Sequence, residues 1–275
     1  MPTDNMESAL EAIQFFANSA NSVRVFEALA NGVTTSSTLA EHTGASRSTV
    51  ARILTEGESR GWVESEGSRY ELTYMGELMI EEFHTYLETV KGAQQLKDVI
   101  NYLPEPAREL DIRHLRDAKI TTPSEEWPQA HFNRALELYR TSETYRGLTQ
   151  VAPEMIVQTL ADVVERGQLE LEGVIEAEFI EELVDNPEQA APWHAFADQV
   201  WLYDGHIPVN MHLIDGRVVL WIDRAGGNRV RGGEGLLESE HPAVVSWAES
   251  LYREYKSEAE PLDPTRLPEA QSGRS

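Results

Sequence analysis

The chain has 275 residues, 47 acidic and 23 basic, which gives a formal net charge of −24 at pH 7. Its hydrophobic fraction of 41% is enough for a packed core and argues against wholesale disorder. With no cysteine, the chain has no disulfides, thiolate nucleophiles or zinc–thiolate sites. We find no run of about 18 apolar residues and no signal-peptide pattern, and therefore expect a cytoplasmic protein without a membrane span.

The acidic excess predicts repulsion from nucleic acid at low salt, because DNA is itself a polyanion. The carboxylates are spread along the whole chain, and only four of the basic residues are lysine. This composition resembles that of proteins from salt-loving archaea, and an ordinary acidic protein is the alternative. At molar salt the Debye length is about 3 Å, so net charge would no longer decide which partners bind.

The first quarter of the chain predicts a series of short helices. Apolar spacing places them at residues 6–18, at 23–30 and at a third segment ending at residue 42. Ser22 is the expected N-cap of the second helix, and Ser37 or Thr38 that of the third. Gly44 follows in a tight turn that needs a left-handed residue.

A fourth helix, capped by Ser46, has two different faces. Its apolar residues fall together at spacings of three and four: Val50, Ile53, Leu54 and Gly57. The opposite face and its N-terminal end are small, polar and basic: Arg47, Ser48, Thr49, Arg52, Thr55 and Ser59. Short hydroxyl side chains permit close approach to a major groove, and arginine binds guanine edges or phosphates.

Two alternating runs, residues 62–65 and 69–73, flank a turn at 66–68 and predict a hairpin. The resulting order of helices, turn, helix and hairpin is that of a winged helix. The sequence from Thr38 to Leu54, followed by Gly61-Trp62-Val63, resembles the winged helix-turn-helix of prokaryotic transcription regulators.

This resemblance covers about residues 20–75. It implies that residues 46–52 read the major groove of an operator in double-stranded DNA, and that Arg69 contacts the minor groove or its phosphates. The expected DNA contacts are Ser46, Arg47, Ser48, Thr49, Arg52, Thr55, Arg60, Ser68 and Arg69. Residues 1–75 carry five arginines against ten acids, so the alternative is a winged helix that binds protein or assembles subunits.

Residues 74–102 contain no proline and keep a nearly helical apolar rhythm, which predicts one long helix or two end to end, terminated by Pro104 and Pro106. In winged-helix regulators such a helix commonly pairs with its copy. A homodimer would suit paired half-sites on DNA. The alternative is a helix packed wholly on its own chain.

The remainder predicts a separate α/β domain, since strands alternate with helices and end in a meander. Expected strands lie at 145–152, 169–176, 200–203, 209–214 and 217–222, and expected helices at 131–140, 153–166, 179–183, 190–197 and 244–255. Asp215-Gly216 predicts a hairpin turn between the last two strands. The predicted fold class is α/β (α+β): winged helix 1–75, helical connector 76–103, mixed-sheet sensor domain 104–262 and disordered tail 263–275.

Residues 146–153, the helix after them, 169–175 and 245–255 resemble, in pattern and order, effector domains fused behind winged helices in archaeal regulators. Examples are the middle domain of a methanogenesis regulator and the sugar-responsive regulators of the maltose-operon type. The resemblance implies a small-molecule effector and a role in central carbon metabolism.

Residues 223–235 combine five glycines with Arg224, Arg229 and Arg231. Such a segment can bind an anion through backbone NH groups and guanidinium groups; the alternative is a mobile loop with solvated arginines. Arg146, beside a strand end, is the other candidate ligand contact.

No catalytic motif stands out. No histidine has a lysine two residues later, as the His-x-Lys-x-x-x-x-Asp motif of phospholipase D-like enzymes requires, and neither a Gly-x-Ser-x-Gly nor a P-loop motif occurs. We expect no catalytic residues, metal or cofactor. The prediction is a DNA-binding transcription regulator controlled by a small metabolite. The alternative is an enzyme or ligand carrier whose winged helix serves only assembly.

Overall fold

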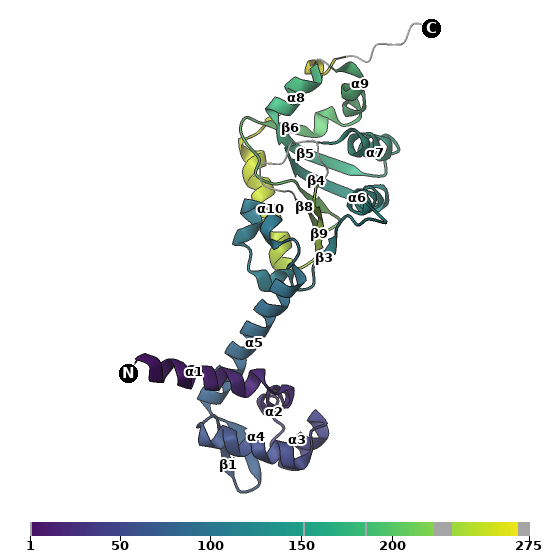
Figure 1. Cartoon of the computed structure of the whole chain (residues 1–275). Coiled ribbons are helices and arrows are strands. Elements are labelled where there is room, and N and C mark those ends of the chain that lie inside the picture. The colour runs from purple at the N-terminus through teal and green to yellow at the C-terminus, as the bar shows by residue number, and fades with distance from the viewer. Residues whose placement is uncertain (1, 151, 185, 223–232, 269–275) are drawn as a thin grey trace. The chain divides into compact units, whose positions relative to one another are not determined.

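The structure, a computed structural model, describes residues 2–150, 152–184, 186–222 and 233–268. The chain divides into two compact units, Met1–Val90 and Lys91–Ser275. The boundary falls inside one helix, α5 (Tyr74–Gln95), to which each unit contributes a part (Figure 1).

The first unit is a winged helix, as predicted. Its elements are α1 (Pro2–Ala17), α2 (Ala20–Ala30), α3 (Ser36–Thr43), α4 (Arg47–Ser59), β1 (Val63–Glu66), β2 (Arg69–Leu72) and the start of α5. β1 and β2 pair antiparallel, with Val63 opposite Leu72 and Glu66 opposite Arg69. Thr35 forms an isolated bridge to Arg69, which adds one residue of a third strand to the wing.

Two of the predicted helix caps are wrong. Ser19 rather than Ser22 caps α2, because Ser22 lies buried within that helix. Thr35 caps α3, where it forms a capping box with Thr38. Gly44 has the predicted left-handed conformation, with φ 70°.

Aromatic rings fill the core of the winged-helix unit. Phe16 stacks on Trp62 with ring centroids 5.6 Å apart, and Phe26 and Phe83 meet Phe16 at 5.1 Å. At Gly76 of α5 a Cβ atom would lie 2.0 Å from the Trp62 carbonyl oxygen. This glycine therefore lets α5 approach the backbone before the wing.

Helix α5 ends at Gln95, well before the prolines that were expected to end it. A turn and a short 3-10 helix (Ile100–Tyr102) follow. Leu96, Val99 and Leu103 are buried in a core of the second unit. The helix therefore ends before the prolines, in a segment that packs into this core.

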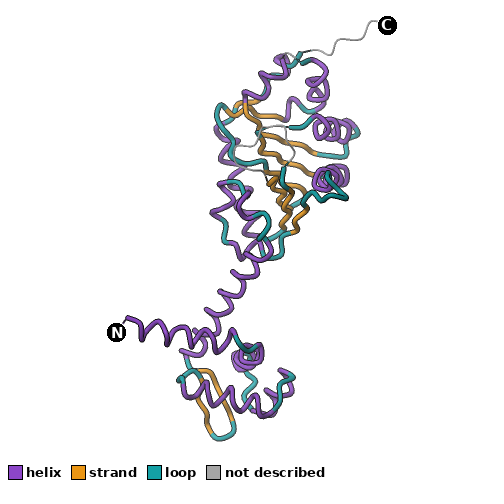
Figure 2. The backbone as a smooth tube through the Cα atoms, in the orientation of Figure 1, coloured by secondary structure: helices purple, strands orange, loops and turns teal. Residues whose placement is uncertain are grey.

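The second unit contains a mixed sheet of eight strands among its described residues (Figure 2). The strands are β3 (Lys119–Thr121), β4 (Thr144–Thr149), β5 (Glu170–Glu176), β6 (Val200–Tyr203), β7 (Met211–Ile214), β8 (Arg217–Ile222), β9 (Gly235–Ser239) and β10 (Glu260–Pro261). Their order is β10-β6-β5-β4-β7-β8-β9-β3. β4, β5 and β6 are parallel, and the other pairs are antiparallel, which confirms the predicted mixed α/β class.

Helices cover both faces of this sheet (Figure 1). They are α6 (Ala130–Thr141), α7 (Glu154–Glu165), α8 (Ala177–Val184), α9 (Pro187–Ala190) and α10 (Pro242–Glu258). Helices α6 to α9 contribute to one hydrophobic core, and α10 joins the segment after α5 in the other. With a core on each face, β8 buries five successive residues, which explains its nearly continuous apolar sequence.

The turn between β7 and β8 is the predicted one, with φ 48° at Asp215 and 78° at Gly216. Strands β3, β9 and β10 were not predicted. Within the expected tail, residues 264–266 form a 3-10 helix and Leu267 is buried, so this part packs on the sheet unit. Residues 269–275 lie outside the described chain.

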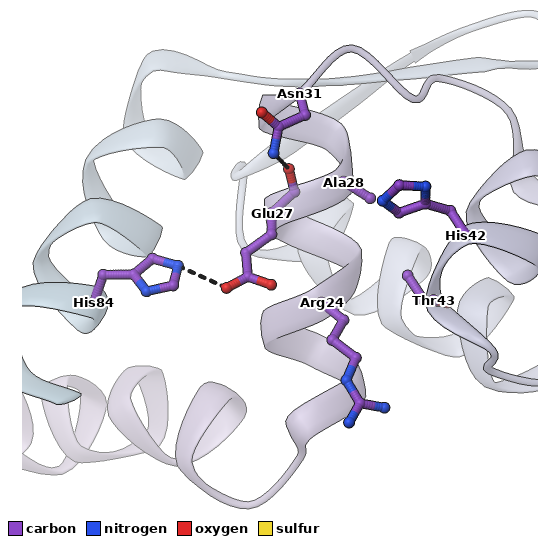
Figure 3. A pocket seen from close by; sticks show the side chains of 7 residues that line it. All are labelled: Arg24, Glu27, Ala28, Asn31, His42, Thr43 and His84. Carbon is purple, nitrogen blue, oxygen red and sulfur yellow. Dashed lines mark hydrogen bonds and ion pairs between the residues drawn. The ribbon is translucent and has the colours of Figure 1, made fainter. Parts of the chain in front are cut away.

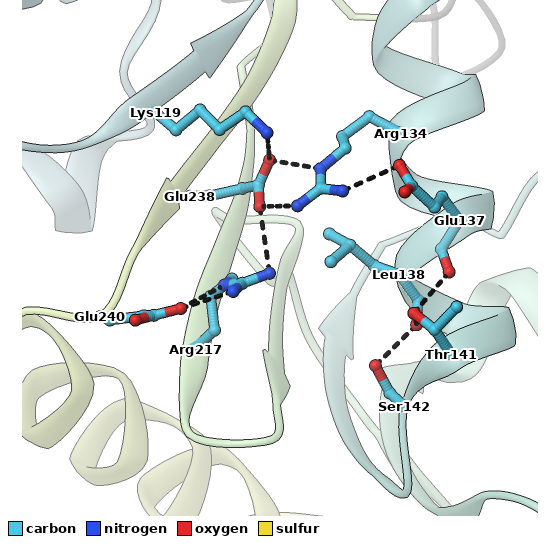
Figure 4. A network of polar contacts seen from close by, with 9 residues as sticks. All are labelled: Lys119, Arg134, Glu137, Leu138, Thr141, Ser142, Arg217, Glu238 and Glu240. Carbon is cyan, nitrogen blue, oxygen red and sulfur yellow. Dashed lines mark hydrogen bonds and ion pairs between the residues drawn. The ribbon is translucent and has the colours of Figure 1, made fainter.

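A buried carboxylate ties α6 to the sheet (Figure 4). Glu238 of β9 accepts two hydrogen bonds of 2.8 Å from Arg134 of α6, and Arg217 lies 3.3 Å away. Burial alone would raise the pKa of Glu238, but the hydrogen bonds and charge of Arg134 outweigh it and lower that pKa. Glu238 therefore stays ionised and connects strands and helix that are distant in sequence.

Two buried histidines differ in how well they are satisfied. His212 of β7 forms a hydrogen bond of 2.8 Å with the Tyr139 hydroxyl. His131 of α6 packs beside Phe132 and Trp221, and within the described chain neither of its ring nitrogens has a hydrogen-bond partner. Burial lowers the pKa of both imidazoles, that of His212 to about 3.

We expect His131→Leu to raise the free energy of unfolding by about 1–2 kcal/mol, because it removes two buried polar atoms that have no hydrogen-bond partner among the described residues. The matched substitution His212→Leu should lower it by about 1–3 kcal/mol, since the Tyr139 hydroxyl loses its hydrogen bond with His212. Urea titrations followed by tryptophan fluorescence in molar potassium chloride measure both. A His131→Leu protein less stable than the wild type would contradict this interpretation.

We also predict that acidification weakens the sheet unit through His212. The unfolded imidazole takes up a proton near pH 6.5 and the folded one only near pH 3, so stability falls as the pH drops through this window. Between pH 7 and about pH 5 the loss should be about 2 kcal/mol. The same titration on His212→Leu should show a shallower pH dependence; equal slopes would exclude His212 as the cause.

Candidate nucleic-acid interface

The hydroxyl groups at the start of α4 form one small network. Ser46 caps the helix by accepting a hydrogen bond of 3.1 Å from the Thr49 amide. Its hydroxyl also lies 2.9 Å from that of Ser48 and 2.8 Å from that of Thr49. The cap thus fixes the hydroxyls that were predicted to contact DNA.

The two faces of α4 are divided as the spacing predicted. Val50, Ile53, Leu54 and Gly57 are buried. The predicted outward residues Arg47, Ser48, Arg52, Thr55 and Ser59 are all exposed, and Thr49 is half-buried. Ser48 and Arg52 are therefore accessible rather than packed against the chain's own core.

Arg52 has an acidic neighbour. Its side chain is 62% exposed and lies 3.4 Å from Glu56, one turn further along α4. Glu56 also forms an ion pair of 3.0 Å with Arg60. Because the Arg52 pair is exposed, its contribution to stability is small, and Arg52 can exchange Glu56 for another anion at little cost.

Arg60, one of the expected DNA contacts, has its side chain directed toward the aromatic core. Its guanidinium lies over the Phe15 ring at 5.4 Å and the Trp62 ring at 5.2 Å, and its Nε atom is buried. The side chain is only 26% exposed. These contacts make Arg60 part of the packing of the winged-helix unit, because the aromatic faces attract its charge inward.

The wing presents the remaining predicted residues. Ser68 lies in the turn after Gly67, which has φ 65°, and Arg69 begins β2; both are exposed. Neither Arg69 nor Arg47 forms an ion pair within the described chain. Ser65 of the wing donates a hydrogen bond of 2.6 Å to Glu58 of α4, which fixes the hairpin on the helix it follows.

A polar hollow of about 420 Å³ on the same unit was not predicted (Figure 3). Its floor is one face of α2, and its walls come from α3 and α5; the lining residues are Arg24, Glu27, Ala28, Asn31, His42, Thr43 and His84. Across it, the Nε2 atom of His84 lies 3.0 Å from a carboxylate oxygen of Glu27. The i, i+3, i+4, i+7 spacing of the floor residues was a usable signal, but the walls come from other helices.

On the sheet unit, Arg146 of β4 forms an ion pair of 3.6 Å with Glu249 of α10. The neighbouring strand places Glu172 opposite Arg146, and Glu172 accepts a hydrogen bond of 2.7 Å from Tyr252 and pairs with Lys256. Arg146 thus belongs to a polar cluster between sheet and helix. The other predicted ligand contacts, Arg224, Arg229 and Arg231, lie outside the described residues.

Further polar groups gather where the parallel strands end. At the end of β4, Asn210 accepts hydrogen bonds of 2.7 Å from Thr149 and 2.9 Å from the Gln150 amide. At the end of β5, the buried Glu176 accepts one of 2.8 Å from the Ile207 amide and lies 2.9 Å from His206. No group of three or more potential metal ligands occurs among the described residues.

Two families match this chain. Residues 10–95 match the HVO_A0261 N-terminal domain, and residues 128–258 match the middle domain of the methanogenesis regulatory protein FilR1. The first match spans the winged helix and α5, and the second spans most of the sheet unit. Taken together, the two matches support an archaeal transcription regulator. No curated protein matches this regulator.

Solved structures similar to the regulator include TrmBL2, described as an archaeal chromatin protein with a novel mode of DNA binding (13% identity, TM-score 0.39, 92% of this chain and 99% of that one). NucT from Helicobacter pylori is 14% identical with TM-score 0.42, over 53% of this chain and 99% of its own. The phospholipase D family member Nuc from Salmonella typhimurium is 10% identical with TM-score 0.39, over 52% and 97%. In the described part of the regulator, no helix has the length and apolar character needed to cross a bilayer.

We expect Ser46→Ala to lower the stability of the winged-helix unit by about 1 kcal/mol, because it removes the cap of α4. Thr55→Ala, on the same exposed face, makes a matched control that should change stability by less than about 0.5 kcal/mol. Thermal unfolding followed by circular dichroism compares the two. Equal effects would mean that the cap does not stabilise α4.

Proposed function

We propose that this regulator reads an operator in double-stranded DNA with the outward face of α4. The observation that carries the proposal is the exposure of Ser48, Arg52 and Thr55 on a helix whose other face is buried. Short hydroxyls and one arginine on a rigid, capped helix fit a major groove. Arg47 and Arg69, exposed and without ion pairs in the described chain, supply phosphate contacts on either side.

The acidic surface makes this binding dependent on concentrated salt. Glu56 lies beside Arg52, and Glu66 is opposite Arg69 in the wing hairpin, so carboxylates accompany the contacts themselves. In dilute salt they would repel phosphate, whereas at molar salt repulsion beyond about 3 Å is screened. We infer a halophilic setting in which short-range contacts decide binding.

The sheet unit is proposed to bind a small metabolite that shifts operator affinity. Support comes from the polar groups at the ends of β4 and β5, the edge of an open α/β sheet where ligands bind. Arg146, Arg224, Arg229 and Arg231 are the proposed contacts for an anionic group of that ligand. We infer that the ligand is a metabolite of central carbon or sugar metabolism. The proposed role of this unit is regulatory rather than catalytic. Since the proposed partner is chromosomal DNA, we infer that the protein works in the cytoplasm.

We propose further that the regulator acts as a homodimer, which matches paired half-sites on DNA. Two recognition helices held at one spacing read two half-sites about 34 Å apart. A ligand that favours one spacing over another then changes operator affinity, because it has different affinities for the two arrangements.

We expect Arg52→Ala to cost about 1–3 kcal/mol of operator binding and to relax base preference at one position. Footprinting and binding titrations on genomic fragments in molar potassium chloride measure this. Arg24→Ala, an exposed arginine away from α4, is the matched control and should bind as the wild type does. Glu56→Gln should tighten binding, because it removes the carboxylate that competes for Arg52. An unchanged footprint for Arg52→Ala would refute the proposed reading face.

A further inference from the structure

Exposed apolar side chains concentrate on two helices of the winged-helix unit. Of the ten large hydrophobic residues exposed in the described chain, seven lie on α1 or α5: Met6, Leu10, Ile13, Tyr74, Met75, Leu78 and Tyr86. Apolar surface gathered in this way marks an interaction site rather than ordinary scatter.

On α1 the exposed residues form a coiled-coil seam. Met6, Leu10, Ile13 and Ala17 are spaced by four, three and four residues, and the first three are 67%, 49% and 45% exposed. This is the alternation of a and d positions in a heptad repeat. The side of α1 that packs on its own unit carries Phe16, about a quarter of a turn from the centre of the seam, and Phe15, about half a turn from it.

The first part of α1 makes no buried contact with its own unit. Residues 6–11 are all exposed, and the aromatic anchors come only in the last turn. Isolated helices shorter than about 12–15 residues are marginal in water, so a helix attached by one end needs a partner along its length.

The exposed side of α5 is a poorer candidate. Met75 and Leu78 begin a similar stripe, but the next positions at the same spacing are Glu82, Thr85 and Thr89. The two threonines donate hydrogen bonds back to carbonyl groups of their own helix. A continuous apolar seam is therefore present on α1 and not on α5.

We propose that α1 pairs antiparallel with α1 of a second copy of this chain. The residues that would meet across the seam favour this direction. In an antiparallel pair, Leu10 of one copy meets Ile13 of the other, and the long Met6 meets the small Ala17. A parallel pair would place the two Ala17 residues together and leave a gap in that layer. In each copy, the rest of the winged-helix unit follows the C-terminal end of α1. Antiparallel pairing therefore also keeps the two winged-helix units at opposite ends of the helix pair.

The residues that flank the seam are also compatible with pairing between two copies of α1. Glu7 flanks the seam beside Leu10, and antiparallel pairing sets it next to the neutral Gln14 of the other copy. The arrangement has two-fold symmetry, with the same surface used by both copies. The inference deepens the proposed homodimer by naming its surface as α1 instead of α5, and it rests on that part of the proposed function.

The test compares matched variants of the full chain in molar potassium chloride without DNA. Leu10→Glu should weaken the dimer about 100-fold in sedimentation equilibrium, because it places a carboxylate in two layers of the seam. Leu78→Glu, the same change on α5, should leave the dimer constant unchanged. Both sites are solvent-exposed, and circular dichroism verifies the fold of each variant.

Direction is tested by crosslinking, which the chain allows because it has no cysteine of its own. A mixture of Met6→Cys and Ala17→Cys proteins should form disulfide-linked dimers on mild oxidation, whereas Met6→Cys alone should not. A monomeric wild type, a dimer broken by Leu78→Glu and not by Leu10→Glu, or efficient crosslinking of Met6→Cys alone would each overturn the proposal. Since no DNA is present, these outcomes are independent of operator binding, which Arg52→Ala tests separately.

Discussion

The burial of one face of α4 is the constraint on which the rest of the winged-helix unit depends. Val50, Ile53 and Leu54 enter an aromatic core that Phe16 and Trp62 hold together. Their spacing leaves the helix one orientation, in which the hydroxyls and Arg52 face water. A rotation that hid these polar groups would expose three large apolar side chains, each costing about 1.5–3 kcal/mol. The orientation of the proposed reading face is thus fixed by the buried residues behind it.

Charge acts on this face at short range. Glu56 lies between Arg52 and Arg60, and the two arginines have different fates. Arg60 lies over aromatic rings and is held in the packed unit, whereas Arg52 remains in solvent with an exposed and exchangeable partner. An acidic protein can therefore keep an available guanidinium on the proposed reading face, provided that screening removes the more distant repulsion.

Local pattern predicted the elements whose formation depends on neighbours in sequence. The periodicity of α4 and the Asp215-Gly216 turn are read directly from adjacent residues, and both were predicted correctly. Strands β3 and β9 pair with each other across more than a hundred residues, and β3 has only three residues, so no local signal separates them from loops. The pairing is decided by the tertiary fold.

The same distinction explains the candidate sites. Exposure of Ser48 and Arg52 follows from helical spacing, which the sequence contains. The inward position of Arg60 depends on Phe15, which belongs to another helix. The caps were misassigned for a related reason: Ser22 has the right chemistry, but burial of α2 against the core extends that helix by one more turn, to Ser19. Residue type identifies candidates, and packing selects among them.

Helix α5 contributes to both units, and in each unit a glycine of α5 lies where the helix comes closest to the neighbouring backbone. Gly76 lies against the Trp62 carbonyl in the first unit, and at Gly92 a Cβ atom would lie 2.3 Å from the Ile112 carbonyl in the second. Each unit thus holds its own end of α5 by backbone approach, where even a methyl group would force a shift.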